Sequence, residues 1–315
     1  MNLVETDVRD AFFDQIYALA EKDQNLVFIT ADADAFSLRK FKNDFPDRFI
    51  NVGVAEQNMV LVATGLALCG KSVFIYSIIP FITQRSLEHI KVNICSMNLP
   101  VTIVGSGAGL SFAFDGPTHH ATQDIAAMKS LPEMTILSPS DSQSSHFSAM
   151  AAYESETPVY VRLDKGKFPE IYKADDDFGE GAKYLIRGQD IILITTGFMT
   201  QRALDISLKL KEHGLNVGVV DISRIKPLNE KLLASVLSDA KIVYTLEEHS
   251  IIGGLGTSIS ELISDHGIDV KLNRISLPDK QIFDYGDRDW LHSLYGLDKD
   301  SLVKSLLTIK GSSPK

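Results

Sequence analysis

This 315-residue sequence has few cysteines and no long apolar run. Its two cysteines, Cys69 and Cys95, lie in apolar-looking segments without metal-ligand spacing. We expect two buried, unpaired thiols in a reducing compartment, with a disulfide bridge between them as the alternative. No apolar run reaches the roughly 18 residues of a membrane span, and no basic-then-apolar leader opens the chain. These absences predict a cytoplasmic protein without a membrane partner.

An excess of basic charge is also absent. The 31 lysines and arginines face 41 aspartates and glutamates, giving a net charge of −10. Such a charge argues against electrostatic binding of nucleic acid or of an anionic membrane, although a small anionic substrate stays possible. A hydrophobic content of 44% predicts a globular protein with a substantial core, and the length allows two domains.

Short apolar runs alternate with longer helical patterns along the whole chain. This alternation predicts an α/β fold with two domains, each a mainly parallel sheet flanked by helices. We place the larger domain at 1–175 and the smaller at 185–315, joined by a polar linker within 164–183. The predicted strands are 26–30, 73–76, 101–104, 135–137, 158–162, 190–195, 216–221, 241–246 and 270–275. The predicted helices are 4–22, 58–68, 84–95, 124–130, 142–155, 201–213, 229–238 and 255–266.

One acid, Glu56, interrupts an otherwise uncharged, mostly apolar stretch before the Ala/Gly/Leu-rich segment 60–69. A carboxyl group at a helix start in such dry surroundings would be partly protonated at neutral pH. It could then exchange a proton with a basic ring nitrogen of a ligand. The alternative is a first-turn acid that faces water and is stabilised by the helix dipole.

A second candidate site is the loop Asp115-Gly116-Pro117-Thr118-His119, which follows the predicted strand 101–104 and a glycine-rich segment. Loops at the carboxyl ends of parallel strands line the ligand crevice of such sheets. Asp115 could bind a hydroxyl group and His119 could shuttle a proton. The alternative is an Asx-turn and a solvent-exposed histidine; His120 is the less certain candidate.

These motifs, in this order, resemble the transketolase family over nearly the whole chain. The resemblance rests on Val-Ala-Glu-Gln-Asn-Met at 54–59, and on segments 73–77, 84–88, 98–100, 115–120 and 253–256. It implies a thiamine-diphosphate-binding fold followed by a transketolase C-terminal-like domain. It also implies that Glu56 hydrogen-bonds the aminopyrimidine ring of the cofactor, and that Asp115 and His119 contact sugar hydroxyls and take part in catalysis.

The resemblance also implies further cofactor-binding residues. Phe81 is the candidate for stacking on the aminopyrimidine, with ordinary core packing as the alternative. Tyr76 and Arg85 are expected beside the cofactor, although Arg85 could instead pair with Glu88 on a helix surface.

Arg162 and Lys165 are the expected substrate-binding cations. Related enzymes that handle sugar phosphates often have a second arginine where this chain has Lys165, and lysine lacks the bidentate fork that suits phosphate. A histidine of many full-length transketolases also has no counterpart, since Ser106-Gly107 occupies that stretch. We therefore expect an unusual acceptor sugar, differently phosphorylated or not phosphorylated.

The diphosphate- and metal-binding motif of the family, Gly-Asp-Gly followed by Asn, is missing. The chain thus resembles one subunit of a split transketolase. A partner subunit would bring the diphosphate site with Mg²⁺ or another divalent ion, in an α2β2 assembly that is inactive without both chains. The alternatives are the β subunit of a 2-oxoacid dehydrogenase-type enzyme and a non-catalytic assembly subunit.

The motif Gly253-Gly254-Leu255-Gly256 could bind an anion at a helix N-terminus. Tight packing at a strand-to-helix turn is the better interpretation, because the spacing of a dinucleotide site is missing.

Overall fold

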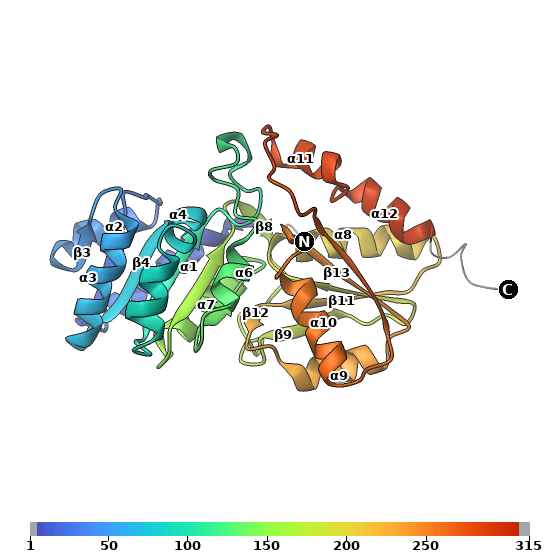
Figure 1. Cartoon of the computed structure of the whole chain (residues 1–315), viewed down its shortest axis with the longest axis horizontal. Helices are drawn as coiled ribbons and strands as arrows, with labels where there is room; N and C mark the ends of the chain where they lie inside the picture. Colours follow the sequence, from blue (N-terminus) through green and yellow to red (C-terminus); the bar gives the residue numbers. More distant parts are fainter. Residues whose placement is uncertain (1–4, 309–315) are drawn as a thin grey trace.

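A computed structural model describes residues 5–308 and shows two α/β domains side by side (Figure 1). Each domain has a mostly parallel sheet with helices on both faces, so the predicted fold class is confirmed. Among the described residues, no helix has the length and apolar character required to cross a membrane.

The first sheet has seven strands in the order β12-β6-β7-β5-β4-β2-β3. All neighbours are parallel except β12, which pairs antiparallel with β6. The strands are β2 (Leu26–Thr30), β3 (Phe49–Asn51), β4 (Ser72–Ile78), β5 (Val101–Ser106), β6 (Thr135–Leu137), β7 (Val159–Leu163) and β12 (Arg224–Lys226). The central strands β2, β5 and β7 are buried along their whole length, as their unbroken apolar runs predict.

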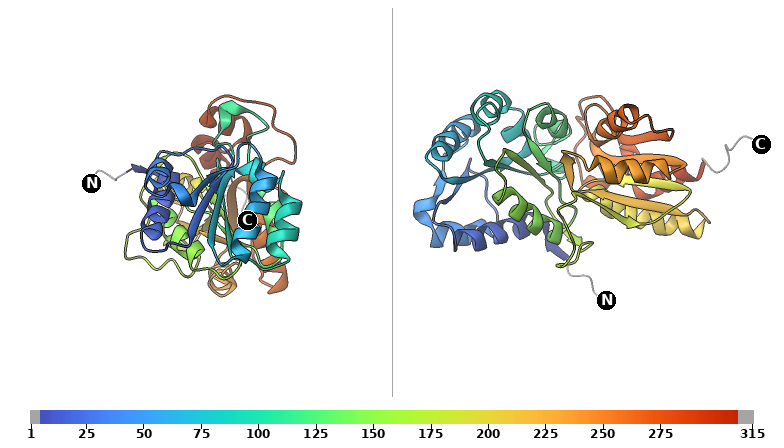
Figure 2. Two further views of the ribbon diagram at one scale, coloured as in Figure 1. Left: turned by 90° about the vertical axis from the view of Figure 1, so that its left-hand side faces the viewer. Right: turned by 90° about the horizontal axis from the view of Figure 1, so that it is seen from below.

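Helices cover both faces of this sheet (Figure 2). The aromatic core on one face joins α1 (Val8–Ala20), α2 (Leu38–Asp44) and α7 (Ser142–Tyr153) to β2 and β4. The aliphatic core on the other face joins α3 (Glu56–Leu68), the π-helix η2 (Ile90–Cys95) and α6 (Asp124–Lys129) to the same strands. Shorter helical turns are α4 (Ile79–Thr83), α5 (Leu87–His89), η1 (Pro46–Arg48) and η3 (Ala113–Asp115).

The second sheet has the order β14-β13-β10-β11-β9, parallel except for β9. Its strands are β9 (Ala182–Ile186), β10 (Ile191–Thr195), β11 (Val217–Ile222), β13 (Ile242–Ser250) and β14 (Lys271–Leu277). Its helices are α8 (Phe198–Glu212), α9 (Glu230–Ser238), α10 (Leu255–Asp265), α11 (Arg288–Tyr295) and α12 (Lys299–Leu307).

The two domains are joined by a shared strand and by a shared hydrophobic cluster. Strand β12 belongs by sequence to the second half but extends the first sheet. One hydrophobic cluster runs across the boundary, from Ile125 and Met134 to Leu255 and Ile259. The stretch 164–183, predicted as a linker, contains β8 (Lys167–Pro169), which pairs with β1 (Glu5–Asp7).

Two helix predictions need correction. The helix predicted at 4–22 begins at Val8, because the Asp7 side chain caps it by accepting from the backbone of Arg9 and Asp10; residue 4 lies outside the described residues. The helix predicted at 84–95 is α5 with the π-helix η2, and a separate short helix begins earlier because Pro80 favours a first helical turn.

The prediction for the cysteines is right for one residue only. Both thiols are unpaired and Cys95 is buried, but Cys69 is exposed. Cys69 follows the last turn of α3, where the chain leaves the core at Gly70 to reverse into β4. An apolar composition alone does not reveal that reversal.

Candidate functional site

Glu56 lies at the carboxyl edge of the first sheet, as the first residue of α3 after β3. It is 2% exposed, so the predicted burial is confirmed and the water-facing alternative is wrong. Ser77 Oγ, at the end of β4, donates to Glu56 Oε1 at 3.3 Å. The Arg85 guanidinium donates to Glu56 Oε2 at 2.7 Å. A buried carboxylate is stable only when such partners compensate its lost hydration.

Arg85 joins this acid to an aromatic ring. Its side chain is 44% exposed and lies over Phe81, with 4.6 Å from Cζ to the ring centroid. Gln57 Nε2 also donates to the Arg85 carbonyl oxygen at 3.2 Å. Of the two interpretations of Arg85, a position beside Glu56 is therefore supported over pairing with Glu88.

The His119 ring packs edge-on against the ring of Phe81, the predicted stacking residue. The two ring centroids are 5.0 Å apart, with an interplanar angle of 71°. Thr118 Oγ1 lies 3.0 Å from His119 Nδ1. Asp115 is exposed on η3 of the same loop, one turn before His119. The structure thus brings Glu56, Arg85, Phe81 and His119 into one continuous strip.

His120 points away from this strip. It is buried, and its Nε2 lies 3.5 Å from the Ala113 carbonyl oxygen. Burial lowers the pKa of His120, so its ring is neutral near pH 7.

The two predicted substrate-binding cations have different environments. Lys165 is exposed, with its Nζ 4.8 Å from the centroid of Phe112, a ring that also flanks His119 at 6.2 Å. Arg162, by contrast, is buried and donates through Nε to Asp124 at 2.8 Å. The structure therefore does not support Arg162 as a substrate ligand: its charge is neutralised in the interior.

Tyr76 is not brought to the site. Its ring lies in the aromatic core on the α1 side of the sheet, 4.8 Å from the ring of Phe13, and its hydroxyl meets Ser106 Oγ. Side chains alternate along a strand, so Ser77 and not Tyr76 faces Glu56. Ser77 was missed by sequence reasoning, although this period of two could have identified it.

The glycine motif at 253–256 forms a tight turn, as predicted. Glu247, at the end of β13, accepts from the backbone N–H groups of Leu255 at 2.7 Å and Gly256 at 2.8 Å. A Cβ atom at Gly254 would overlap the carboxylate of Glu247. The N-terminus of α10 thus already holds an anion from its own chain, where a bound phosphate would lie.

A second candidate for a ligand site is a cavity in the second domain. A cavity of about 980 Å³ lies between Tyr184, Asn216 and Lys231, at the amino ends of β10 and β11. Ligands of parallel sheets bind at the carboxyl ends, where the Glu56 strip lies, so we place the candidate site there. Within residues 5–308, no group of three or more His, Cys, Asp or Glu side chains could hold a metal ion.

Comparisons with known proteins agree with this layout. Residues 4–170 match the family model described as transketolase, pyrimidine binding domain, and residues 180–302 match transketolase, C-terminal domain. The chain is 33% identical to an apulose-4-phosphate transketolase subunit of Phocaeicola vulgatus, over 95% of this chain and 96% of that protein. It is 31% identical to a 6-deoxy-6-sulfo-D-fructose transketolase subunit of a Clostridium species, over 97% and 95%. A solved split-gene transketolase, described as an inactive beta4 tetramer, superposes with a TM-score of 0.86 at 31% identity, covering 97% of this chain and 98% of that one.

Proposed function

The chain belongs to the transketolase family, and from this premise we propose that it is the C-terminal subunit of a split, thiamine-diphosphate-dependent transketolase. The complete enzyme would transfer a two-carbon ketol unit from a ketose to an aldose. A second polypeptide would carry the diphosphate- and metal-binding domain. The observation that carries this proposal is the strip Glu56–Arg85–Phe81–His119 at the carboxyl edge of the sheet.

The residues of the strip fit the pyrimidine end of the cofactor. Glu56 Oε2 accepts from a flat, cationic N–H donor, the Arg85 guanidinium, which lies over the Phe81 ring. An aminopyrimidine offers the same two features, N–H groups for a carboxylate and a flat face for an aromatic ring. Arg85 thus stands in for the cofactor ring in the free chain, and we propose that it swings away from Oε2 when the ring binds.

When bound, thiamine diphosphate supplies the nucleophilic carbon that breaks and forms the C–C bond. Glu56, which is 2% exposed, would hold a proton at Oε2 against the pyrimidine nitrogen. His119 would offer its Nε2 to a sugar hydroxyl, since Thr118 Oγ1 lies beside its Nδ1. Asp115, exposed on the same loop, would bind a second hydroxyl. Lys165 beside Phe112 is the proposed contact for an anionic group of the substrate.

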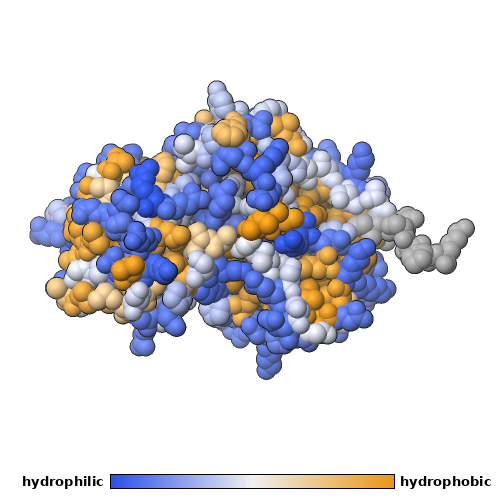
Figure 3. Space-filling view, viewed as in Figure 1, coloured by the Kyte–Doolittle hydropathy of each residue, from blue (hydrophilic) through white to orange (hydrophobic). Residues whose placement is uncertain are grey.

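We propose a heterotetramer of two copies of each chain. One apolar surface supports a protein partner. Helices α3 and η2 pack together, and they and the turn after η2 expose four large apolar side chains, Leu61, Leu68, Val92 and Met97, which we call the α3 face. Figure 3 shows apolar residues gathered over the α3 end of the first domain. Large apolar side chains that are exposed together on neighbouring elements often mark an interface.

Reconstitution with the partner tests the function. The chain, co-expressed with a diphosphate-binding transketolase subunit, should transfer ketol units, and free and phosphorylated sugars should be compared as acceptors. Glu56→Gln should lower kcat by about 10²-fold or more by removing the proton-exchanging acid. Glu88→Gln, at an acid on α5, is the matched control and should leave kcat unchanged. Turnover by the chain alone, or full activity of Glu56→Gln, would contradict the proposal.

A further inference from the structure

The loop that carries Asp115 and His119 is embedded in the second domain. This segment, residues 107–123, which we call the His119 loop, rises between β5 and α6 beside the segment that leads to α11 (Figure 1). Its residues Leu110 and Ala113 are buried in the core of the second domain, in one cluster with Leu277 and Ile282. The two domains therefore fix the loop together, and it is not a free surface connection.

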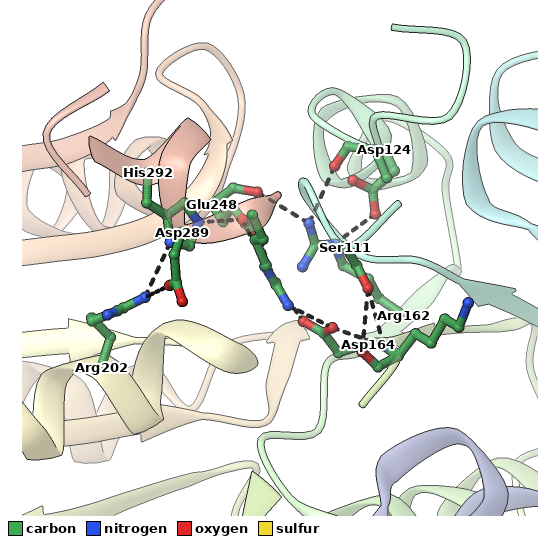
Figure 4. A network of polar contacts seen from close by, with 11 residues as sticks. Ser111, Asp124, Arg162, Asp164, Arg202, Glu248, Asp289 and His292 are labelled. Atoms are coloured by element: carbon green, nitrogen blue, oxygen red, sulfur yellow. Dashed lines mark hydrogen bonds and ion pairs between the residues drawn. The ribbon is translucent and has the colours of Figure 1, made fainter. Parts of the chain in front are cut away.

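A buried ion network joins the domains directly under this loop. Arg288, the first residue of α11, donates to both oxygens of Asp164, at 2.9 and 2.7 Å. The same guanidinium donates to both oxygens of Glu248 on β13, at 3.0 and 2.5 Å. His292 Nε2 lies 2.5 Å from Glu248 Oε1. We call Asp164, Arg288 and Glu248 the clamp. Figure 4 shows Asp164 on a segment of the first domain and Glu248 on a segment of the second.

Glu248 and Arg288 carry opposite charges in the clamp. Burial opposes the charge on Glu248, but Arg288 and His292 outweigh it and hold the pKa of Glu248 well below its ordinary value. Burial likewise opposes the charge on Arg288, but Asp164 and Glu248 raise its pKa above the ordinary value. Neither group therefore changes its charge near neutral pH.

The His119 loop contacts the clamp directly at Gly109, and contacts the neighbours of the clamp, Arg162 and Lys165, at Ala121 and Ser111. At Gly109, which has φ +59°, a Cβ atom would overlap the carboxylate of Glu248, so loop backbone and clamp are in direct contact. Arg162 Nη2 donates at 3.3 Å to the carbonyl oxygens of both Ala121 and Glu248. Lys165, next to Asp164, donates its backbone N–H to Ser111 Oγ at 3.3 Å.

A buried ion network of this kind adds little net free energy to folding. Exchanging a buried ion cluster for apolar side chains of similar volume is often neutral or even stabilising, because desolvation offsets the Coulomb attraction. A bidentate guanidinium, in contrast, fixes the relative orientation of the groups that it joins. Here those groups are the end of β7, the end of β13 and the start of α11, which surround the His119 loop.

We propose that Arg288 and Glu248 are positioning residues, which hold the His119 loop so that the His119 ring stays against Phe81. The second domain thereby sets the geometry of the substrate side of the site without touching substrate. This inference rests on the proposed function for its effect on turnover, but the placement of the loop is a property of the chain alone.

The test compares two contacts between the domains. Arg288→Met removes the clamp, and Arg288→Lys keeps the charge without the fork. Gly109→Ala pushes the loop off Glu248. The control is Lys129→Met, because Lys129 also joins the domains, through Ser258 at 2.8 Å and Glu261 at 3.0 Å, but does so from α6 outside the loop.

Hydrogen–deuterium exchange on the full chain without partner gives the first measurement. Arg288→Met and Gly109→Ala should speed exchange within 107–123, Arg288→Lys should do so less, and Lys129→Met should leave the loop as in the wild type. Trp290, the one tryptophan of the sequence, lies two residues from Arg288 and reports displacement of α11 by its fluorescence.

Turnover with the partner gives the second measurement. Arg288→Met and Gly109→Ala should lower kcat for ketol transfer by about 10- to 100-fold, the typical result of a misplaced catalytic group. Thiamine diphosphate binding to the assembled complex, measured by calorimetry, should be unchanged, since Glu56 and Phe81 lie on the first domain.

Three outcomes would overturn the inference. The first is that Arg288→Met and Lys129→Met show the same exchange rate in the loop. The second is that Arg288→Met speeds exchange in the loop without lowering kcat. The third is that Arg288→Met weakens thiamine diphosphate binding by the same factor as it lowers kcat. If Arg288→Met does not fold, Gly109→Ala and Arg288→Lys decide the question. If the wild-type complex transfers no ketol unit, the proposed function fails, while the exchange measurement still decides whether the clamp holds the loop.

Discussion

Glu56 and Arg85 form an ion pair in which only the carboxylate is fully buried. The Glu56 carboxylate accepts from two side chains, Ser77 and Arg85. Removing Arg85 leaves the Ser77 hydroxyl as its side-chain donor. We therefore expect Arg85→Met to lower the free energy of unfolding of the isolated chain by about 1–3 kcal/mol, the cost of leaving a buried polar group unsatisfied. Urea unfolding measures this change.

A double substitution provides the check on this prediction. Adding Glu56→Gln to Arg85→Met replaces the stranded charge with a neutral amide, so most of the lost stability should return. If the two changes are simply additive, Arg85 does not act through Glu56 in the free chain.

Asp221, a buried residue of β11 at the boundary between the domains, should make the stability of the fold depend on pH. Burial raises the pKa of Asp221 to about 6, although Ser140, Thr200 and Tyr172 donate hydrogen bonds to it. The folded chain thus binds a proton more tightly than the unfolded chain does. The stabilisation is complete below the unfolded pKa of 3.8 and is lost as the pH rises through about 6.

Asp221→Asn tests this linkage. Near pH 7 the ionised Asp221 costs about 3 kcal/mol relative to its protonated form, from a shift of about two units at 1.36 kcal/mol each. Asparagine carries no charge, so stability should fall less steeply between about pH 4 and pH 7 in this variant than in the wild type. Parallel slopes of the two proteins in denaturant titrations over that range would contradict the assignment.

The sequence predicted the positions of those candidate residues whose surroundings are formed by nearby chain segments. Glu56 is a lone acid in an apolar run, and the loop around His119 follows a strand, so neighbours along the chain indicate their positions. Arg162 could not be predicted as a structural residue, because its partners Asp124 and Glu248 are distant in sequence. The clamp was missed for the same reason: Asp164 and Arg288 are 124 residues apart.

Among the elements, those with an unbroken pattern of their own were predicted well. Strands β2 and β6 have the bounds expected from the sequence, and α7 begins at Ser142, as expected. The missed elements depend on tertiary partners. Strand β12 has three residues and is ordered by pairing with β6 in the other domain, which no local periodicity reveals.

The buried side chain of Glu247 caps the first turn of α10, and substituting it tests how much the cap stabilises the helix. Each oxygen of Glu247 accepts one backbone N–H of the first turn. Glutamine has only one acceptor oxygen, so Glu247→Gln should leave one N–H facing an amide group and lower stability by about 1–3 kcal/mol. Thermal unfolding measures the change.

Glu261→Gln is the matched control for this helix. Glu261 lies on the same helix but is exposed and pairs with Lys129, so its substitution should change stability by less than about 1 kcal/mol. Equal effects of the two substitutions would show that Glu247 does not hold the helix start.

The molecule as a whole combines a net charge of −10 with an uncovered apolar α3 face. The composition of α3 is apolar on nearly all sides, which is typical of a helix that is buried in the complete assembly. The negative net charge keeps the protein in solution, and we expect the α3 face to be a site of association.

Leu61→Glu combined with Leu68→Glu tests this surface. Both side chains are about half exposed, so the isolated chain should keep its fold, whereas a buried interface would have to desolvate two carboxylates without partners. We expect the variant to sediment as a smaller species and to lose co-purification with the diphosphate-binding subunit. Leu208→Glu, at a similarly exposed leucine on α8 of the second domain, is the control and should assemble like the wild type. Normal assembly of the α3 variant, with the fold verified by circular dichroism, would place the interface elsewhere on the molecule.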